Sequence, residues 1–427
     1  MPSRLAVIGT GYVGLTTGVC LAHLGHHVVC ADIDAEKVAR LSAGEVPIVE
    51  DGLAPLLAEG LASGRLSFVV GGAAAVADCD IAFLCVPTPQ GDDGSADLTY
   101  IEAAARQIAP ALPSGAIVVN KSTVPVGSTR VVERALGRSD VRVVSNPEFL
   151  REGSAVRDFL NPDRVVVGAD DHEAAHAVAG LYSALEAFTL VTDPPSAETI
   201  KYAANAFLAT KLSFVNAIAA VCEGVGANID DVVAGIGSDT RIGSAFLQPG
   251  PGWGGSCFPK DSRAMVKIAN DAGYRFDLLS GVIAVNDQQY DRTTQKVIDS
   301  CGGSITGKTI AVWGLTFKAG TDDLRESPSL HVIERLVAAG ARVVAHDPTV
   351  SAHRNGLPGS IVLAPTPLDA CGGADALCVL TEWPEYSAVS ETDVAQVMVS
   401  RSVVDARNVL DRDAWISAGF EYRGIGR

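Results

Sequence analysis

The sequence predicts an α/β protein with a parallel sheet toward each end of the chain and a helical region between them. Val- and Ile-rich runs alternate with Ala-rich stretches, a pattern typical of parallel strands that helices cover on both faces. The two ends resemble each other in outline, since each opens with an apolar strand, a turn, a helix and a second strand. Residues 196–223 contain neither Gly nor Pro, so a single helix of about 40 Å is possible at about 1.5 Å per residue.

The individual elements follow from these runs. In the first part of the chain, a helix ends near His23 and strands are predicted at Leu5–Ile8, Val28–Ala31, Ile81–Val86, Ile117–Asn120 and Val141–Ser145. In the last part, a helix is predicted at Leu330–Ala339 and strands at Thr309–Trp313, Arg342–Ala345, Ala376–Leu380 and Ser402–Asp405. We therefore expect three domains: an α/β domain over 1–200, a helical domain over 201–300 and a smaller α/β domain over 301–427.

The composition excludes several classes of protein. A net charge of −17 leaves no basic surface for nucleic acid or for anionic lipid. No window approaches the roughly 18 apolar residues of a transmembrane helix, and the N-terminus lacks the features of a signal peptide, so we expect no membrane insertion. The nine cysteines show no paired CxxC spacing, which favours the reduced cytoplasm and predicts no metal site.

A glycine turn is the clearest motif. It follows the first strand, opens a helix and reads Gly9-Thr10-Gly11-Tyr12-Val13-Gly14. Asp32 ends the second strand, 18 residues after Gly14. In this setting the glycines allow a pyrophosphate to approach a helix N-terminus, and the carboxylate accepts hydrogen bonds from the ribose hydroxyls. The motif predicts an NAD site, because the 2′-phosphate of NADP would meet the carboxylate.

Two further residues are candidates for the cofactor site. Lys37 could contact the adenosine end of NAD, although a lone lysine is more often a solvated surface charge. Thr88 lies in the turn Pro87-Thr88-Pro89, at the carboxyl end of a predicted strand, where ligands bind to parallel sheets.

Four other segments complete a pattern that extends along the chain: Lys121–Gly127, Asn146–Gly153, Lys201–Asn205 and Gly254–Asp261. Together with the glycine turn, in this order, they resemble the UDP-glucose/GDP-mannose dehydrogenase family over essentially the whole sequence. The resemblance implies an N-terminal Rossmann-type NAD domain, a central helical region with a long spine helix that forms a homodimer, and a C-terminal Rossmann-like domain for the nucleotide sugar.

Cys257 is the candidate nucleophile. Oxidation of an alcohol to an acid needs two hydride transfers, and an aldehyde gives up hydride only after a nucleophile has added to it. Cys257 follows two glycines and precedes Pro259, which suits the first turn of a helix, and Lys260 is close by. A cysteine in this position is expected to be a reactive thiolate, whereas the other eight cysteines fit a structural role.

Lys201 and Asn205 are four residues apart, so they share one face of the long helix and could stabilise oxyanions. Cys257 and Asp261 have the same spacing. The resemblance implies that Asp261 and Thr123 hold a water, that Glu148 is the base acting on a Cys257 thioester, and that Glu152 lies beside the nicotinamide. Either glutamate could instead cap a helix.

The remaining site residues come from the resemblance. The cofactor set also includes Lys260 and Arg325. Lys318 is expected to contact the substrate. It lies in the last α/β domain, and because the first turn of that domain lacks GxGxxG, its ligand is expected to be a nucleotide diphosphate and not a second dinucleotide. Arg241 corresponds to an arginine that reaches the neighbouring subunit. The other residues expected to contact the nucleotide sugar are Phe149, Leu150, Arg151, Phe246, Leu247, Gln248, Pro249, Gly250 and Gly254.

Within the family, these segments are most similar to the branch that oxidises UDP-glucose to UDP-glucuronate, a reaction that serves polysaccharide synthesis. Two alternatives stay open. A sibling enzyme would act on GDP-mannose or a UDP-N-acetylhexosamine. A catalytically silent nucleotide-sugar sensor would be expected to lose Cys257, Lys201 or Asp261, and the sequence keeps all three.

Overall fold

The computed structural model describes residues 2–91, 96–351 and 357–427. It divides into two compact units. The first comprises Met1–Ala204 and Arg263–Ala272, and the second comprises Asn205–Ser262 and Gly273–Arg427. The boundary runs through two helices, so the division into three domains at residues 200 and 300 stays a prediction.

The first unit contains a sheet with the strand order β3-β2-β1-β4-β5-β6-β7-β8 among the described residues. The strands are β1 (Arg4–Ile8), β2 (His27–Asp32), β3 (Leu66–Val70), β4 (Ile81–Leu84), β5 (Ile117–Asn120), β6 (Arg142–Ser145), β7 (Arg164–Gly168) and β8 (Phe188–Thr192). Neighbouring strands are parallel except β6 and β7, which pair in antiparallel fashion through Ser145 and Gly168. The prediction of a parallel sheet is therefore confirmed except at this pair.

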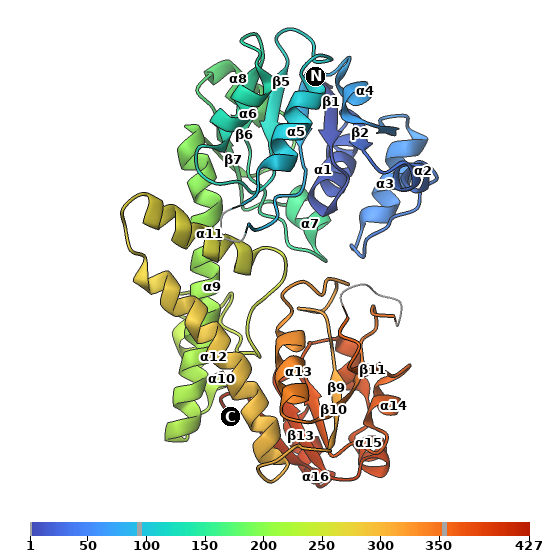
Figure 1. The fold of residues 1–427 in the computed structure, drawn as a ribbon, viewed down its shortest axis with the longest axis vertical. Helices are drawn as coiled ribbons and strands as arrows, with labels where there is room; N and C mark the ends of the chain where they lie inside the picture. Colours follow the sequence, from blue (N-terminus) through green and yellow to red (C-terminus); the bar gives the residue numbers. More distant parts are fainter. Residues whose placement is uncertain (1, 92–95, 352–356) are drawn as a thin grey trace. The chain divides into compact units, whose positions relative to one another are not determined.

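Helices cover both faces of this sheet (Figure 1). They are α1 (Tyr12–His23), α2 (Ala35–Ser42), α3 (Leu53–Ala62), α4 (Gly72–Val76), α5 (Thr99–Ile108), α6 (Ser128–Leu136), α7 (Ala155–Leu160) and α8 (His172–Gly180). Alternate residues of β1 face opposite sides, because strand side chains alternate. Leu5 and Val7 join the core under α1, whereas Ala6 and Ile8 join the core under α5.

The second unit contains a parallel sheet with the order β11-β10-β9-β12-β13-β14. Its strands are β9 (Thr309–Trp313), β10 (Arg342–His346), β11 (Ile361–Leu363), β12 (Ala376–Val379), β13 (Ser402–Asp405) and β14 (Glu421–Gly424). Its helices are α10 (Ile229–Gly237), α12 (Asp277–Ser300), α13 (Pro328–Ala338), α14 (Pro367–Cys371), the 3-10 helix η1 (Pro384–Ala388), α15 (Glu391–Val397) and α16 (Arg412–Ser417). This order repeats the order of the first six strands of the first sheet, which explains why the two ends of the sequence look alike.

Helix α9 (Pro194–Val225) is the uninterrupted helix that the sequence predicts, and α11 (Phe258–Asp271) begins directly after Cys257. Each carries residues of both units. Among the described helices, α9 is long and apolar enough to span a membrane, with a mean hydropathy of 1.4 in its most apolar window. The expectation that no stretch reaches this level was wrong for α9. A buried core helix passes the same test, and 44% of that window is buried.

Candidate active site

The glycine turn between β1 and α1 has the geometry of a phosphate cradle. A Cβ on Gly14 would lie 1.9 Å from the carbonyl oxygen of Gly9, so this approach of helix to strand requires glycine. A Cβ on Gly11 would meet no atom within 4 Å. Gly11 is also the N-cap of α1, which has no side-chain cap. No side chain of the described residues caps this helix N-terminus, and the space beside Gly11 is open, so the turn fits the pyrophosphate of NAD.

Asp32 lies at the end of β2 beside this turn. It accepts hydrogen bonds from the backbone N–H of Thr10 at 3.0 Å and from the Lys37 ammonium at 3.0 Å. Burial alone would raise the pKa of Asp32, but hydrogen bonds from Thr10 and Lys37 outweigh burial and lower the pKa to about 2. Asp32 is thus an anion at neutral pH, and Lys37 is its partner instead of a free surface charge.

The predicted cofactor residues Thr88 and Thr123 also meet, since the Thr88 hydroxyl donates to the Thr123 carbonyl at 2.9 Å. A second connection reaches the segment that holds Glu152. Glu50 accepts from the Tyr12 hydroxyl at 2.8 Å and from the Gly153 N–H at 2.8 Å. Glu50 was not predicted, because an isolated glutamate before Asp51 carries no motif of its own.

Glu148 and Lys201 form a buried ion pair in the first unit. The Lys201 ammonium donates to Glu148 Oε1 at 2.8 Å, and each side chain is 4% exposed. The other carboxylate oxygen accepts from the Leu150 N–H at 2.7 Å. Burial favours a higher pKa for Glu148, but the charge and hydrogen bond of Lys201 outweigh it, so the pKa lies below its usual value. In this arrangement Glu148 is ionised and Lys201 lies near the ring of Phe149.

Cys257 lies immediately before the first residue of α11 in the second unit. Its carbonyl accepts the first helical hydrogen bond, from the Asp261 N–H at 2.8 Å. Pro259 occupies the first turn, as the sequence predicts. Cys257 and Cys301 are partly exposed, whereas the other seven cysteines are buried. Cys257 is therefore an accessible thiol at a helix N-terminus, a position that stabilises the thiolate.

Asp261 has no exposed surface and connects two predicted residues. Its Oδ2 accepts from the Asn205 amide at 2.6 Å, and its Oδ1 lies 3.1 Å from the Lys260 ammonium. Asn205 follows Lys201 by one turn of α9, so this helix carries one residue of each cluster. The first cluster comprises Glu148 and Lys201, and the second comprises Asn205, Asp261 and Cys257.

The glycine-rich loop before Cys257 is held by buried amides. A Cβ on Gly254 would lie 1.9 Å from the Glu326 carbonyl oxygen, and a Cβ on Gly255 would touch the ring of Phe317. Three amide side chains on α9 and α12 bond to the backbone of Gly250 and Trp253: Asn216, Asn286 and Gln289. The sequence analysis missed these amides, because amides inside a helical pattern look like solvated polar residues until the fold buries them.

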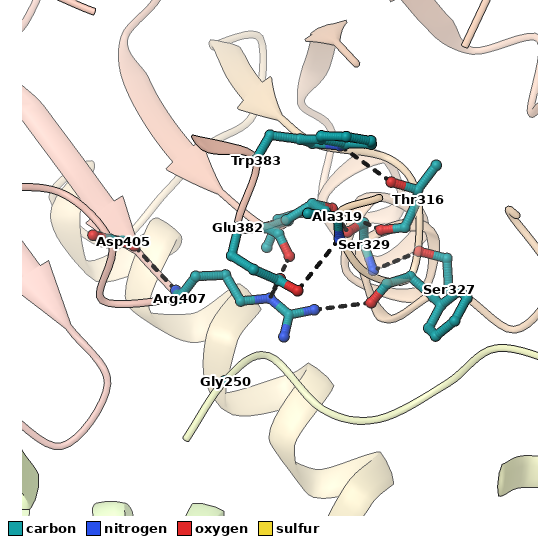
Figure 2. Close-up of polar contacts among 12 residues, drawn as sticks. Gly250, Thr316, Ala319, Ser327, Ser329, Glu382, Trp383, Asp405 and Arg407 are labelled. Atoms are coloured by element: carbon teal, nitrogen blue, oxygen red, sulfur yellow. Dashed lines mark hydrogen bonds and ion pairs between the residues drawn. The ribbon is translucent and has the colours of Figure 1, made fainter. Parts of the chain in front are cut away.

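Arg407 joins the parts of the second unit that are expected to hold the nucleotide sugar (Figure 2). It follows β13 and donates to the carbonyls of Leu380 at 2.8 Å and Phe317 at 3.0 Å. It also pairs with Glu382 at 3.1 Å, and a Cβ on Gly250 would lie 3.2 Å from its guanidinium. Lys318, next to Phe317, lies over that ring. The missed signal was the position of Arg407, at the carboxyl end of a parallel strand.

The turn after β9 carries side chains, whereas the turn after β1 leaves open space beside Gly11. Asp347 follows β10 as Asp32 ends β2, and it accepts hydrogen bonds from Leu315 N–H, from Thr316 N–H and hydroxyl, and from the Trp383 indole. A Cβ on Gly314 would lie 2.3 Å from Thr381. The side chains of Thr316 and Trp383 therefore lie at this turn, which agrees with the absence of GxGxxG.

Two predicted arginines pair locally. Arg241 bonds to Asp239 at 2.6 Å and its side chain is 87% exposed, and Arg325 forms a bidentate pair with Asp323. Their roles toward a partner subunit and the cofactor stay predictions. Within the described ranges, no group of three or more His, Cys, Asp or Glu side chains could hold a metal ion.

Comparison with known proteins assigns a family to each part of this arrangement. Models of the UDP-glucose/GDP-mannose dehydrogenase family match as the NAD binding domain over residues 3–186, the central domain over 195–288 and the UDP binding domain over 311–412. A UDP-glucose 6-dehydrogenase of Rhizobium meliloti is 47% identical, with 99% of each chain covered.

Solved structures agree. A UDP-glucose dehydrogenase from Pyrobaculum islandicum superposes with a TM-score of 0.93 at 39% identity, covering 100% of this chain and 98% of that one. A UDP-D-ManNAc dehydrogenase from Pyrococcus horikoshii gives a TM-score of 0.87 at 27% identity, with 99% of each chain covered. The predicted α/β fold class, with an N-terminal Rossmann domain and a long central helix, is confirmed.

Proposed function

The chain belongs to the UDP-glucose/GDP-mannose dehydrogenase family, and from this premise we propose that it is an NAD-dependent UDP-glucose 6-dehydrogenase. It oxidises the C6 hydroxyl of UDP-glucose to the carboxylate of UDP-glucuronate. The observation that carries the proposal is Cys257, an accessible thiol at the start of α11, one turn from an Asp261 that is bonded to Asn205. This arrangement supplies the nucleophile that the second oxidation needs.

The first oxidation requires the protein only to hold the sugar and to accept a proton. The glycine turn and Asp32 would hold NAD, which would supply the hydride acceptor for each of the two oxidations. The hydroxyl proton passes to a water held by Asp261 and Thr123. The product is an aldehyde at C6, which remains in the site beside Cys257.

The second oxidation goes through the sulfur of Cys257. The thiolate adds to the aldehyde carbon, and the resulting oxyanion is stabilised by the Lys201 ammonium and the Asn205 amide. The oxyanion collapses as hydride leaves C6, which gives a thioester. Glu148 takes a proton from a water that attacks the thioester carbon, and the C–S bond breaks to release the acid and restore the thiolate.

The nucleotide half of the substrate is proposed to occupy the second unit. Arg407 and Lys318 are the cations at the carboxyl ends of its strands. The formal charge of the whole chain is −17, so these local cations are what would hold a diphosphate. The loop Phe246–Gly250 lies against Arg407 and is the proposed cover of the sugar.

The protein is further proposed to act as a homodimer in the cytoplasm. Helix α9 exposes four apolar side chains at intervals of seven, seven and four residues: Phe207, Phe214, Val221 and Val225. These intervals place all four on one face of a helix. A second copy of the same stripe is its simplest cover.

The function is tested by following NADH with a panel of UDP-glucose, GDP-mannose, UDP-N-acetylglucosamine and UDP-N-acetylmannosamine. We expect UDP-glucose to give the highest kcat/KM and to yield two NADH per sugar, without free aldehyde. A higher kcat/KM with GDP-mannose or a UDP-N-acetylhexosamine would reassign the substrate and leave the chemistry intact. No turnover of any sugar would favour the sensor.

Variants separate the two oxidations. Cys257→Ala should bind substrate normally but form no acid, whereas the matched control Cys301→Ala should behave as the parent does. Glu148→Gln should accumulate a thioester on Cys257, visible as added mass on the intact protein. Acid formation by Cys257→Ala at the parental rate would refute covalent catalysis.

A further inference from the structure

Lys121 is a buried lysine that has no role in the proposed mechanism. It follows β5, and the residue is 4% exposed. Its Nζ donates to Asn146 Oδ1 at 3.2 Å and to the Tyr182 hydroxyl at 3.4 Å. Both partners are neutral, and no carboxylate of the described residues lies within ion-pair distance. A fully buried cation without a paired anion is costly, so its presence calls for a reason.

The groups around Lys121 come from four elements of the first unit. Cys85 follows β4, Glu148 follows β6, Tyr182 follows α8 and Lys201 lies on α9. Burial raises the pKa of the Cys85 thiol to about 12 and also raises the pKa of the Tyr182 phenol, so both are neutral at physiological pH. The charges that remain are two ammonium groups and one carboxylate, a net charge of about +1.

Of the two ammonium groups, Lys201 is bonded to the Glu148 carboxylate and Lys121 is bonded to a neutral amide. Lys201 is hydrogen-bonded to Glu148 at 2.8 Å, whereas Lys121 bonds to Asn146, two residues before Glu148. Asn146 is itself fixed, because its amide donates to the Val166 carbonyl at 2.8 Å and its oxygen accepts from Tyr182 at 2.7 Å. Lys121 is therefore tethered within the protein, while Lys201 is the cation that the mechanism needs at the oxyanion.

We propose that Lys121 is a positioning residue for Glu148, a fixed cation that keeps this carboxylate ionised whenever Lys201 turns to the reacting oxygen. The inference rests on the proposed function. If Lys201 alone balanced Glu148, its departure would leave a buried, uncompensated anion, which would take up a proton and cease to be a base. A second cation that does not move prevents this loss.

The pKa of Lys121 is consistent with a cation that keeps Glu148 ionised. Burial lowers it to about 8, so Lys121 is still predominantly charged at neutral pH. Reciprocally, the charge of Lys121 contributes to the lowered pKa of Glu148, after the larger effects of burial and of Lys201. Above about pH 8 Lys121 loses its charge, but at such pH Glu148 needs no help to stay ionised.

The test is the pH profile of kcat for Lys121→Met, measured with UDP-glucose between pH 5 and pH 9. Methionine has nearly the same length, and an apolar side chain suits a buried site, so we expect a folded protein. In Lys121→Met the acid limb of the profile, which reports the ionisation of Glu148, should move upward by about one pH unit. Relative to the parent, kcat should then be about tenfold lower at pH values below the limb and less than about twofold lower at pH 8.5. Lys121→Arg should restore the parental limb.

Lys308→Met is the control, because Lys308 is a lysine of the second unit that donates to a backbone carbonyl, that of Cys301, and has no role in the proposed mechanism. Its profile should coincide with that of the parent. A purely structural role for Lys121 would lower kcat in parallel at every pH, and that outcome, like an unmoved limb, would overturn the inference. An inactive parent would instead refute the proposed function.

Thermal unfolding gives a readout that needs no substrate. The pKa of Lys121 is lower in the folded than in the unfolded protein, so the unfolded chain binds more protons between about pH 8 and pH 10.5. Across that window the folded parent gains stability as the pH rises, whereas Lys121→Met does not. The Tm advantage of Lys121→Met should thus be largest below pH 8 and shrink toward pH 10.5. A constant difference in Tm would contradict a buried charge at this position.

Discussion

Asp32 and Glu148 are two carboxylates whose pKa lies below the ordinary value although burial pushes both upward. For Asp32, hydrogen bonds from Thr10 and then Lys37 outweigh burial, and for Glu148 the charge and hydrogen bond of Lys201 do so. The consequences differ. In the proposed function, Asp32 remains an anion throughout and selects NAD, whereas Glu148 acts as a base once Lys201 has turned to the reacting oxygen.

Replacing Asp32 by Asn should therefore change cofactor choice. The neutral amide accepts ribose hydrogen bonds less well and no longer repels a 2′-phosphate, so we expect KM for NAD to rise about tenfold and the preference over NADP to shrink. Steady-state kinetics with both cofactors measure this. The parental KM for NAD should show no Asp32 titration above pH 5, because the pKa of Asp32 is about 2.

A control for this change is Asp51→Asn, which removes an exposed carboxylate of the same unit. It should leave both KM values unchanged. Unaltered discrimination between NAD and NADP in Asp32→Asn would show that another group selects the cofactor.

At the scale of single residues, the sequence predicted those that belong to motifs. Asp32 was recognisable from its distance to the glycine turn, whereas Lys201 and Asn205 were predicted through the family resemblance, because their spacing alone is typical of a solvated helix face. Lys121, Arg407 and the three amides were missed as functional groups, because what distinguishes them is burial and partners far away in the chain. Such contacts exist only after the sheets and α9 have assembled.

At the scale of elements, the central strands and α9 were predicted almost to their ends, since long apolar runs without Gly or Pro leave few alternatives. Strands β3, β7, β8, β11 and β14 were not predicted. Two of them illustrate the reason. β8 is mostly half-exposed with Phe188 67% exposed, and β11 has three residues, so neither shows a continuous buried run. An edge strand is defined by its neighbour more than by its composition.

The glycine turn offers a test in which two similar changes should act differently. Gly14→Ala would place a Cβ 1.9 Å from the Gly9 carbonyl oxygen, so we expect it to destabilise the protein by about 1–3 kcal/mol through overpacking. Gly11→Ala meets no protein atom, so Tm should hardly change. Its methyl group would project into the space proposed for the pyrophosphate, and NAD affinity should fall at least about tenfold.

Calorimetric titration of NAD and thermal unfolding of both variants measure these effects separately. Normal NAD affinity in a folded Gly11→Ala would place the pyrophosphate elsewhere.

At the scale of the whole molecule, a single chain exposes the apolar stripe on α9 that is formed by Phe207, Phe214, Val221 and Val225. Phe207 is 66% exposed and Phe214 is 51% exposed, on a helix whose other face is buried. A strongly acidic chain keeps separate molecules apart, so a specific apolar contact is needed for association. This is the basis of the proposed dimer.

Phe214→Glu should convert the dimer to monomers, because a charge in the middle of a desolvated stripe has no partner. Sedimentation velocity at several protein concentrations measures the change. The control Phe188→Glu alters a phenylalanine on β8 that is 67% exposed, more than Phe214 at 51%, and should leave the assembly intact. A parent that sediments as a monomer at every concentration would rule out the stripe as a dimer contact.

The filled turn after β9 has a consequence for kinetics. The side chains of Thr316 and Trp383 bond to Asp347 Oδ2, and the Thr349 hydroxyl bonds to Oδ1, so side chains fill the space around Asp347 that a ribose would need. We therefore expect that NAD does not compete with the sugar nucleotide at the turn after β9, even though the two sheets share a strand order. We therefore expect high concentrations of NAD to cause no inhibition through this turn, which a titration of NAD at fixed UDP-glucose measures.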